Sequence, residues 1–285
     1  MTFLAARPAS RESSRDGSST VIIGVPFDAT STFRRGSRHA PAAIRWASQS
    51  IETFSPVLRR DLEEVALSDG GDVELAGSDV DAMRSAVRSR IEDIATGTLP
   101  VVLGGEHTVT LAVVEALRQS KGDLAVLQLD AHADLRDEFE GRSLSHATVM
   151  RRIVDRLGRK AVVQLGVRAG SRDEFDAAPG LLRYSSSMLA MPTDVWSWLE
   201  QRPVYVTLDI DVVDPADAPG TGNPEPEGVA ARELLPFVRR LGALRVVGID
   251  LVEVSPPYDP SGRTAILAAT IVREAILAIT ASRPA

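Results

Sequence analysis

The chain has 285 residues, of which 44% are hydrophobic and 25% charged, and its formal net charge is −7. This composition is typical of a globular protein with a full core, and the acidic surplus argues against a nucleic-acid partner, because phosphate binding requires a concentrated basic patch. The absence of Cys excludes disulfides and thiolate metal ligands, and leaves His, Asp and Glu as the strong metal ligands.

Residues 1 to 19 are rich in Ser and Arg, and we expect them to form a flexible N-terminal tail on a cytoplasmic protein. Their apolar stretch at residues 3 to 6 is too short for a signal peptide. The longest apolar segment, at residues 265 to 280, is interrupted by Arg273 and Glu274, so it predicts an amphipathic helix and no membrane partner. The remaining length suits one domain over residues 20 to 285.

Short apolar runs alternate with segments of helical periodicity along this domain. The apolar runs predict eight strands, at residues 21–25, 62–67, 99–103, 124–134, 161–167, 181–184, 204–211 and 244–253. Helical spacing predicts helices at residues 41–50, 78–94, 106–117, 145–157, 187–199, 232–241 and 265–280, while residues 69–72 predict a turn. This alternation indicates an α/β fold, a three-layer α/β/α sandwich with an eight-stranded parallel sheet.

Metal-binding side chains stand at the ends of three predicted strands. They are His107, Asp130, His132, Asp134, Asp209 and Asp211. Alternate residues leave a strand on the same side, and ligands of parallel sheets bind beyond the carboxyl ends of the strands, so we expect these side chains to converge. Taken singly, each His is more often a hydrogen-bonded structural residue. Four carboxylates at one sheet edge, however, would repel one another unless cations lay among them.

The number of carboxylates predicts two metal ions. Four negative charges balance two divalent cations, and a single ion could not use six protein ligands and keep a position open for catalysis. Oxygen-rich coordination without sulfur favours Mn²⁺ over Zn²⁺ and leaves Fe, Co and Ni as alternatives. Two ions roughly 3.5 to 4 Å apart can share a water molecule and lower its pKa toward neutrality, which yields a bridging hydroxide.

Four motifs follow one another along the chain: Gly-Gly-Glu-His at residues 104–107, Asp-Ala-His-Ala-Asp at 130–134, Asp-Ile-Asp-Val-Val-Asp-Pro at 209–215 and Ala-Pro-Gly-Thr-Gly at 218–222. In this order and spacing they resemble the signatures of the ureohydrolases, the family of arginases and agmatinases, and most of all the agmatinases. The resemblance extends from residue 24 to residue 257. It implies an arginase-like fold, two Mn²⁺ ions per subunit and assembly as a homotrimer or homohexamer.

The resemblance also implies a ligand set for each ion. One Mn²⁺ would be held by His107, Asp130, Asp134 and Asp209. The second would be held by Asp130, His132, Asp209 and Asp211. Both Asp130 and Asp209 would therefore bridge the two ions.

The catalytic group implied by the resemblance consists of Asp134, His146 and Glu253. His146 is similar to the proton-shuttling His of the family, and Glu253 to the Glu that binds the substrate guanidinium. A guanidinium is a poor electrophile, so its hydrolysis needs a strong nucleophile, a carboxylate that orients it and an acid for the leaving amine. Without the resemblance, a surface salt bridge at a strand end is the favoured interpretation of Glu253. The alternative interpretation of His146 is the neighbour of a helix cap.

The loop at residues 135–140 bears on the choice of substrate. Arginases bind the α-carboxylate of arginine with an Asn-bearing loop at this place, whereas the loop here contains three acids and no Asn. An acidic rim suits the free amine of agmatine, so we expect a small cationic guanidino substrate, with agmatine hydrolysed to putrescine and urea in polyamine biosynthesis. Departures from the agmatinase pattern occur at Arg35, His39, Ala40, Asn223 and Glu227.

These departures leave sister activities open, on N1-aminopropylagmatine, guanidinobutyrate, arginine or guanidine. The alternative from another class is a non-catalytic metal-binding protein, which would require a damaged ligand set that this sequence does not have. Enzymes similar to histone deacetylases share the sheet but use a single zinc ion. The second carboxylate pair, Asp209 and Asp211, together with His107, argues against them.

Overall fold

The computed structural model describes residues 1–9, 17, 19–94, 96–176, 182–184 and 191–281. Within these residues, nine strands form one sheet in the order β1-β5-β2-β6-β11-β10-β7-β8-β9, and all its neighbouring strands run parallel. They are β1 (Arg7–Pro8), β2 (Thr20–Gly24), β5 (Leu67–Asp72), β6 (Leu99–Leu103), β7 (Ala125–Leu129), β8 (Val162–Leu165), β9 (Leu182–Tyr184), β10 (Pro203–Asp209) and β11 (Arg245–Val252). A separate antiparallel pair consists of β3 (Phe54–Ser55) and β4 (Arg60–Asp61).

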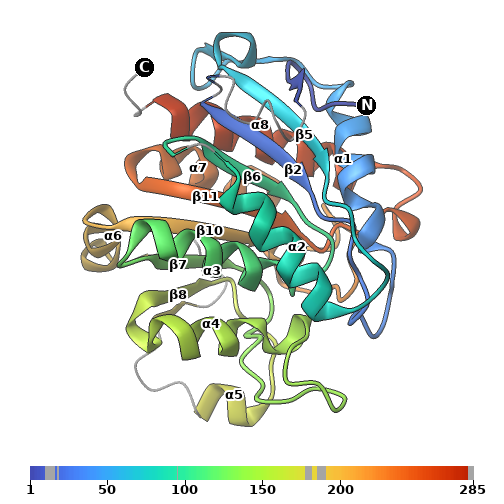
Figure 1. Cartoon of the computed structure of the whole chain (residues 1–285), viewed down its shortest axis with the longest axis vertical. Coiled ribbons are helices and arrows are strands. Elements are labelled where there is room, and N and C mark those ends of the chain that lie inside the picture. The colour runs from blue at the N-terminus through green and yellow to red at the C-terminus, as the bar shows by residue number, and fades with distance from the viewer. Residues whose placement is uncertain (10–16, 18, 95, 177–181, 185–190, 282–285) are drawn as a thin grey trace.

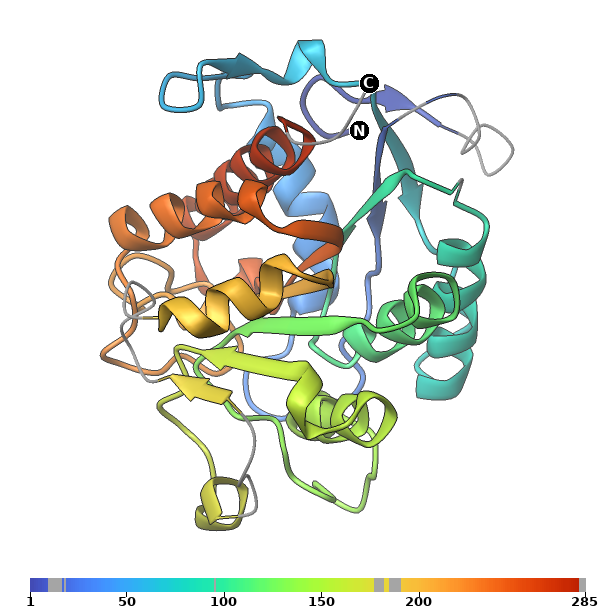
Figure 2. The ribbon, with the colours of Figure 1, turned by 90° about the vertical axis from the view of Figure 1, so that its left-hand side faces the viewer.

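Helices cover both faces of the sheet, as Figures 1 and 2 show from two directions. One face carries α2 (Val80–Glu92), α3 (Val109–Lys121) and α4 (Val149–Leu157). The other carries α1 (Ala40–Ser48), α6 (Thr193–Glu200), α7 (Ala231–Arg240) and α8 (Arg263–Ala281), and the short α5 (Arg172–Asp176) follows β8. The predicted three-layer α/β/α sandwich is confirmed. The first residues of the helix predicted at 187–199 lie outside the described part of the chain.

The strand predicted at residues 62–67 is wrong. Leu62–Glu64 is a 3₁₀ turn, and β5 lies instead over residues 67–72, which we expected to form a turn. A buried ion pair explains the difference, because Asp69 Oδ2 accepts a hydrogen bond from Arg45 Nε at 2.8 Å inside the protein. An acidic residue with such a partner can occupy a sheet position that sequence patterns assign to a turn.

The N-terminal segment is partly packed against the domain. Phe3 is buried, its amide donates to Asp69 Oδ2, and β1 pairs with β5 as a ninth, edge strand. The expectation of a flexible tail is therefore wrong for residues 3–8. Residues 10–16 and 18 lie outside the described part of the chain.

Replacing Asp69 with Ala is expected to lower the free energy of unfolding by about 3 kcal/mol, because a buried ion pair loses one partner. The Arg45 guanidinium would keep Asp72 as a carboxylate neighbour, which places the effect at the low end of the usual range. Urea denaturation followed by circular dichroism measures the change. The control is Asp81→Ala, which removes the exposed ion pair with Arg84 and should cost less than about 1 kcal/mol. Equal losses for the two variants would contradict this role of Asp69.

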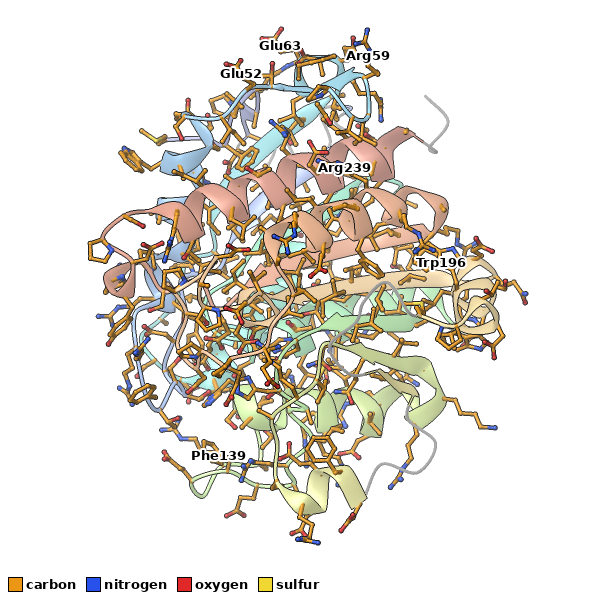
Figure 3. All side chains as sticks on the ribbon, turned by 180° about the vertical axis from the view of Figure 1, so that it is seen from behind. Glu52, Arg59, Glu63, Phe139, Trp196 and Arg239 are labelled. Carbon is orange, nitrogen blue, oxygen red and sulfur yellow. The ribbon has the colours of Figure 1, made fainter. Side chains whose placement is uncertain are left out.

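The C-terminal helix α8 is long and apolar enough to cross a membrane, yet 72% of its most apolar window is buried inside the protein. It packs against α1 and α7, as the view from behind shows (Figure 3). The charges that interrupt its apolar run lie inside this packing. The Glu274 carboxylate is fully buried and accepts hydrogen bonds from Arg273, Arg239 and Ser55. We therefore find a core helix rather than the amphipathic one predicted.

The sheet order brings together segments that are far apart in the sequence. β6 and β7 are joined by α3, but β11 and β10 from the C-terminal half lie between them in the sheet. Because all four strands are parallel, their carboxyl ends meet at one edge, where parallel sheets bind ligands.

Candidate active site

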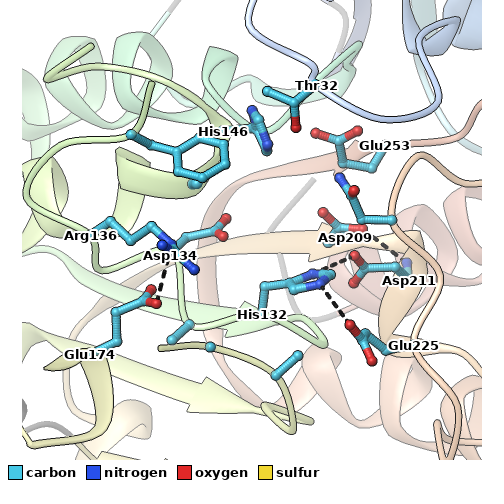
Figure 4. A pocket seen from close by; sticks show the side chains of 16 residues that line it. Thr32, His132, Asp134, Arg136, His146, Glu174, Asp209, Asp211, Glu225 and Glu253 are labelled. Atoms are coloured by element: carbon cyan, nitrogen blue, oxygen red, sulfur yellow. Dashed lines mark hydrogen bonds and ion pairs between the residues drawn. The ribbon is translucent and has the colours of Figure 1, made fainter. Parts of the chain in front are cut away.

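A pocket of about 290 Å³ opens beyond the carboxyl ends of these strands (Figure 4). Its walls include the side chains of Thr32, His132, Asp134, Arg136, Phe139, His146, Glu174, Asp209, Asp211, Asn223, Glu225 and Glu253. Four of the six predicted metal ligands and both predicted substrate-binding residues line this pocket. The other two ligands, His107 and Asp130, are fully buried next to it.

A first group of predicted ligands surrounds His107, in the turn between β6 and α3. Its Nδ1 atom lies 3.0 Å from Asp130 Oδ2, 3.0 Å from Asp134 Oδ2 and 3.6 Å from Asp209 Oδ2. Its Nε2 atom lies 2.9 Å from Thr207 Oγ1, which fixes the ring. Despite these short distances, the buried Nδ1 atom makes no hydrogen bond of acceptable geometry among the described residues. An imidazole nitrogen that faces three carboxylate oxygens in this way fits a shared cation.

A second group consists of Asp130, His132 and Asp211, whose ligand atoms lie within 4.8 Å of one another. His132 Nδ1 is 2.8 Å from Asp211 Oδ2 and 3.7 Å from Asp130 Oδ1. Asp130 belongs to both groups, as a bridging ligand must. Asp209 Oδ1 accepts a hydrogen bond from the Asp211 amide at 2.9 Å, which holds Asp209 next to both groups. The six predicted ligands are thus close together, and their binding of metal stays a prediction.

The buried carboxylates of the two ligand groups repel one another, and this repulsion shifts the pKa values of several side chains. Burial and repulsion from Asp130 raise the pKa of Asp134 to about 7. Burial and repulsion from Asp211 raise the pKa of Asp209 well above its usual value. Burial lowers the pKa of His132, but attraction to Asp211 and Asp130 outweighs it and raises that pKa to about 12. Cations among the carboxylates would relieve this repulsion.

The local structure that carries the ligands differs from the prediction. β7 ends at Leu129, so Asp130, His132 and Asp134 lie in a loop and strand alternation does not direct them. Asp134 has a φ of 53°, in the left-handed region that residues with a Cβ rarely occupy. Such strain persists only where the surroundings impose it, and it is concentrated at functional sites. Likewise β10 ends at Asp209, and a 3₁₀ turn carries Asp211.

His146 lies in the 3₁₀ turn that precedes α4. The Ser145 amide donates to Thr148 Oγ1 at 2.8 Å, which fixes this turn and directs the His146 ring into the pocket (Figure 4). The ring packs edge-on against Phe139, with the ring centroids 5.7 Å apart. Burial and the nearby histidine charges lower the pKa of His146 to about 4, so the ring is neutral at neutral pH.

Glu253 follows β11 directly and projects its carboxylate into the pocket (Figure 4). Its backbone has a φ of 63°, and its Oε1 atom accepts a hydrogen bond from the His107 amide at 2.8 Å. Its amide donates to the carbonyl of Gly105, where a Cβ would lie 1.9 Å from the carbonyl oxygen of Phe27. Burial and repulsion from Glu106 raise the pKa of Glu253 well above its usual value. A surface salt bridge is therefore excluded for this residue.

The acidic rim predicted from residues 135–140 does not form. Arg136 and Phe139 are the residues of this loop that line the pocket, whereas Asp137 is exposed and pairs with Arg152 at 2.8 Å. The pocket carboxylates beyond those already predicted come from Glu174 and Glu225.

Sequence reasoning missed these two glutamates. Glu174, in α5, accepts hydrogen bonds from the Ser171 amide at 2.7 Å and the Leu135 amide at 3.0 Å, and lies 3.4 Å from Arg136 Nε. Glu225 Oε1 lies 3.6 Å from His132 Nε2. Glu174 belongs to an ordinary charged run without a motif. The position of Glu225 between two prolines, in the loop after the second Asp pair, was its only sequence signal.

The family model described as "Arginase family" matches residues 18–278. The chain belongs to the arginase family. An agmatinase of this family from Bacillus anthracis is 40% identical over 280 residues, which cover 96% of this chain and 95% of that protein. A human mitochondrial guanidino acid hydrolase is 34% identical, over 94% of this chain and 80% of that protein.

A solved structure of the same family, the agmatine ureohydrolase of Thermoplasma volcanium, has a TM-score of 0.85 and 34% identity, over 98% of this chain and 94% of that one. The resemblance to ureohydrolases and the arginase-like fold are thereby confirmed. Arginase-family enzymes depend on a binuclear metal centre, and the two ligand groups that share Asp130 fit such a centre.

Proposed function

We propose that this ureohydrolase is a Mn²⁺-dependent agmatinase, which hydrolyses agmatine to putrescine and urea. One observation carries the proposal: two ligand groups that share Asp130 adjoin a pocket into which Glu253 and His146 project. The high identity to the agmatinase named above supports agmatine as the substrate.

The six predicted ligands would hold the two ions, with Asp130 and Asp209 shared between them. Carboxylate oxygens, two imidazoles and no sulfur suit Mn²⁺. When bound, a pair of divalent ions activates water for attack at neutral pH. Asp134 would serve both as a ligand and as part of the pocket wall.

Substrate binding and proton transfer would be carried out by side chains that line the pocket. The Glu253 carboxylate would bind the guanidinium and orient its central carbon, because carboxylate and guanidinium match in charge and geometry. His146 would transfer a proton to the leaving amine nitrogen as the C–N bond breaks. Glu225 and Glu174 would provide negative charge near the ammonium group at the other end of agmatine.

Replacing Glu253 with Gln is expected to raise KM for the guanidino substrate by roughly 10-fold or more, because the neutral amide loses a charged hydrogen bond to the guanidinium. Steady-state urea release measures KM. The control is Glu138→Gln, at an exposed acid in the loop at 135–140 that does not line the pocket, and it should leave KM unchanged. An unchanged KM in the Glu253 variant would refute its role in binding.

A guanidino acid is the second candidate substrate, because the Arg136 guanidinium lines the pocket and could pair with a carboxylate. The values of kcat/KM for agmatine, guanidinobutyrate, arginine and N1-aminopropylagmatine on Mn²⁺-loaded protein decide between the candidates. The proposal requires the highest value for agmatine. A higher value for guanidinobutyrate would establish the second candidate in its place.

The cellular setting follows from the proposed reaction. We propose a cytoplasmic enzyme of polyamine biosynthesis with no nucleic-acid or membrane partner. It has a single ureohydrolase domain, to which the packed residues 3–8 belong together with residues 20–285. Its net charge of −7 supports a cationic substrate. A homotrimer or homohexamer is proposed from the resemblance to the family, and sedimentation velocity tests it.

A further inference from the structure

A buried hydrogen-bonded chain runs from His146 to a carboxylate that the proposed function does not use. The Glu106 side chain is fully buried and Thr30 nearly so, and neither lines the pocket. Thr30 Oγ1 donates to Glu106 Oε1 at 2.6 Å, and the Thr30 amide donates to Glu106 Oε2 at 2.7 Å. On its other side, Thr30 Oγ1 lies 3.1 Å from the His146 amide nitrogen and 3.4 Å from His146 Nδ1.

The donors and acceptors in this chain determine which nitrogen of His146 carries the proton. A hydroxyl has one hydrogen to donate, and Thr30 gives it to the Glu106 carboxylate, so its lone pairs face His146. The Ser31 hydroxyl also donates to this carboxylate, at 3.1 Å. Thr108 Oγ1 lies 3.2 Å from Thr30 Oγ1, and since Thr30 gives its hydrogen to Glu106, Thr108 is the donor in that contact. His146 Nδ1 therefore meets an acceptor, and only its N–H form makes a hydrogen bond there.

We infer that Thr30 is a positioning residue for His146: its hydroxyl, held by Glu106, keeps the proton on Nδ1 and leaves the unprotonated Nε2 facing the pocket. This inference deepens the proposed function and rests on it. The hydrogen bond that one ring nitrogen of a histidine makes fixes both the tautomer and the direction of the ring. It also explains why a carboxylate with no contact to the pocket is buried next to the site.

The arrangement gives His146 a defined part in proton transfer. With Nδ1 protonated, Nε2 can take the proton released when water adds to the guanidinium carbon. Nε2 then returns that proton to the leaving amine nitrogen when the C–N bond breaks. With the opposite tautomer, Nε2 would already carry a hydrogen and could not accept the first proton.

Replacing Thr30 with Val removes the hydroxyl at nearly constant volume and is expected to lower kcat by roughly 10-fold or more, with KM changed less than about 3-fold. The matched control is Ser31→Ala, which removes another hydroxyl from the same carboxylate, at 3.1 Å, but does not touch His146. The control should keep kcat, and Thr30→Ser should restore it. Equal kcat values for the Val variant and the control would overturn the inference.

A second measurement does not depend on the folding of any variant or on turnover. Neutron diffraction from deuterated crystals of the Mn²⁺-loaded wild-type protein locates the exchangeable hydrogens of His146. We expect deuterium on Nδ1, directed at Thr30 Oγ1, and deuterium on Nε2 alone would overturn the inference. A failure of this inference can be distinguished from a failure of the proposed function. Wild-type protein that releases no urea from any guanidino compound would refute the proposed function, whereas the neutron result tests only the role of Thr30.

Discussion

Asp130→Asn is expected to release the metal and to reduce urea release by roughly 10³-fold or more, because the site would lose its means of activating water. Asp130 is the residue that both ligand groups share, and it is fully buried. An amide in its place is neutral and cannot bridge two cations. We expect His132→Ala to have a similar effect, since it removes a ligand of the second group. Elemental analysis of Mn²⁺-equilibrated protein, together with a urea assay, measures both consequences.

The control for Asp130 is Asp123→Asn, which makes the same substitution just ahead of the same strand, at an exposed residue. It should keep both metal content and turnover. Full turnover by the Asp130 variant would refute the metal site, whatever its metal content.

His146→Ala is expected to lower kcat by roughly 10² to 10⁴-fold while the metal content stays at the wild-type level, because the variant loses a proton-transfer group and no ligand. The ring lines the pocket next to Asp134 and Phe139 but belongs to neither ligand group. Steady-state kinetics and elemental analysis on the same protein sample separate the two quantities.

The control for this variant is His39→Ala, at an exposed histidine that does not line the pocket. It should change neither kcat nor metal content. If kcat in His146→Ala equalled that of the control, His146 would have no part in proton transfer.

The layered fold and the place of the site could be predicted from sequence because the apolar runs before Asp130, Asp209 and Glu253 are dense and end in polar residues. In a parallel sheet that pattern gives both the strand and the edge at which its last residues lie. The order of the strands was not predictable in the same way. Nothing local to β6 and β7 shows that β10 and β11 separate them in the sheet.

The errors arise where a long-range partner outweighs a local signal. Asp69 lies in a strand because Arg45 neutralises it, and these two residues are 24 positions apart. In the loop at 135–140, Asp137 is exposed and binds Arg152, while the distant Glu174 supplies a carboxylate to the pocket. The residues next to Asp69 and Asp137 in the sequence do not indicate these distant partners.

Anomalous diffraction at the manganese absorption edge, from crystals equilibrated with Mn²⁺, tests the central claim most directly. We expect two peaks per chain, one enclosed by His107 and Asp134 and the other by His132 and Asp211, with Asp130 next to both. An absence of anomalous peaks at these residues would contradict the dinuclear centre and the hydrolase built on it.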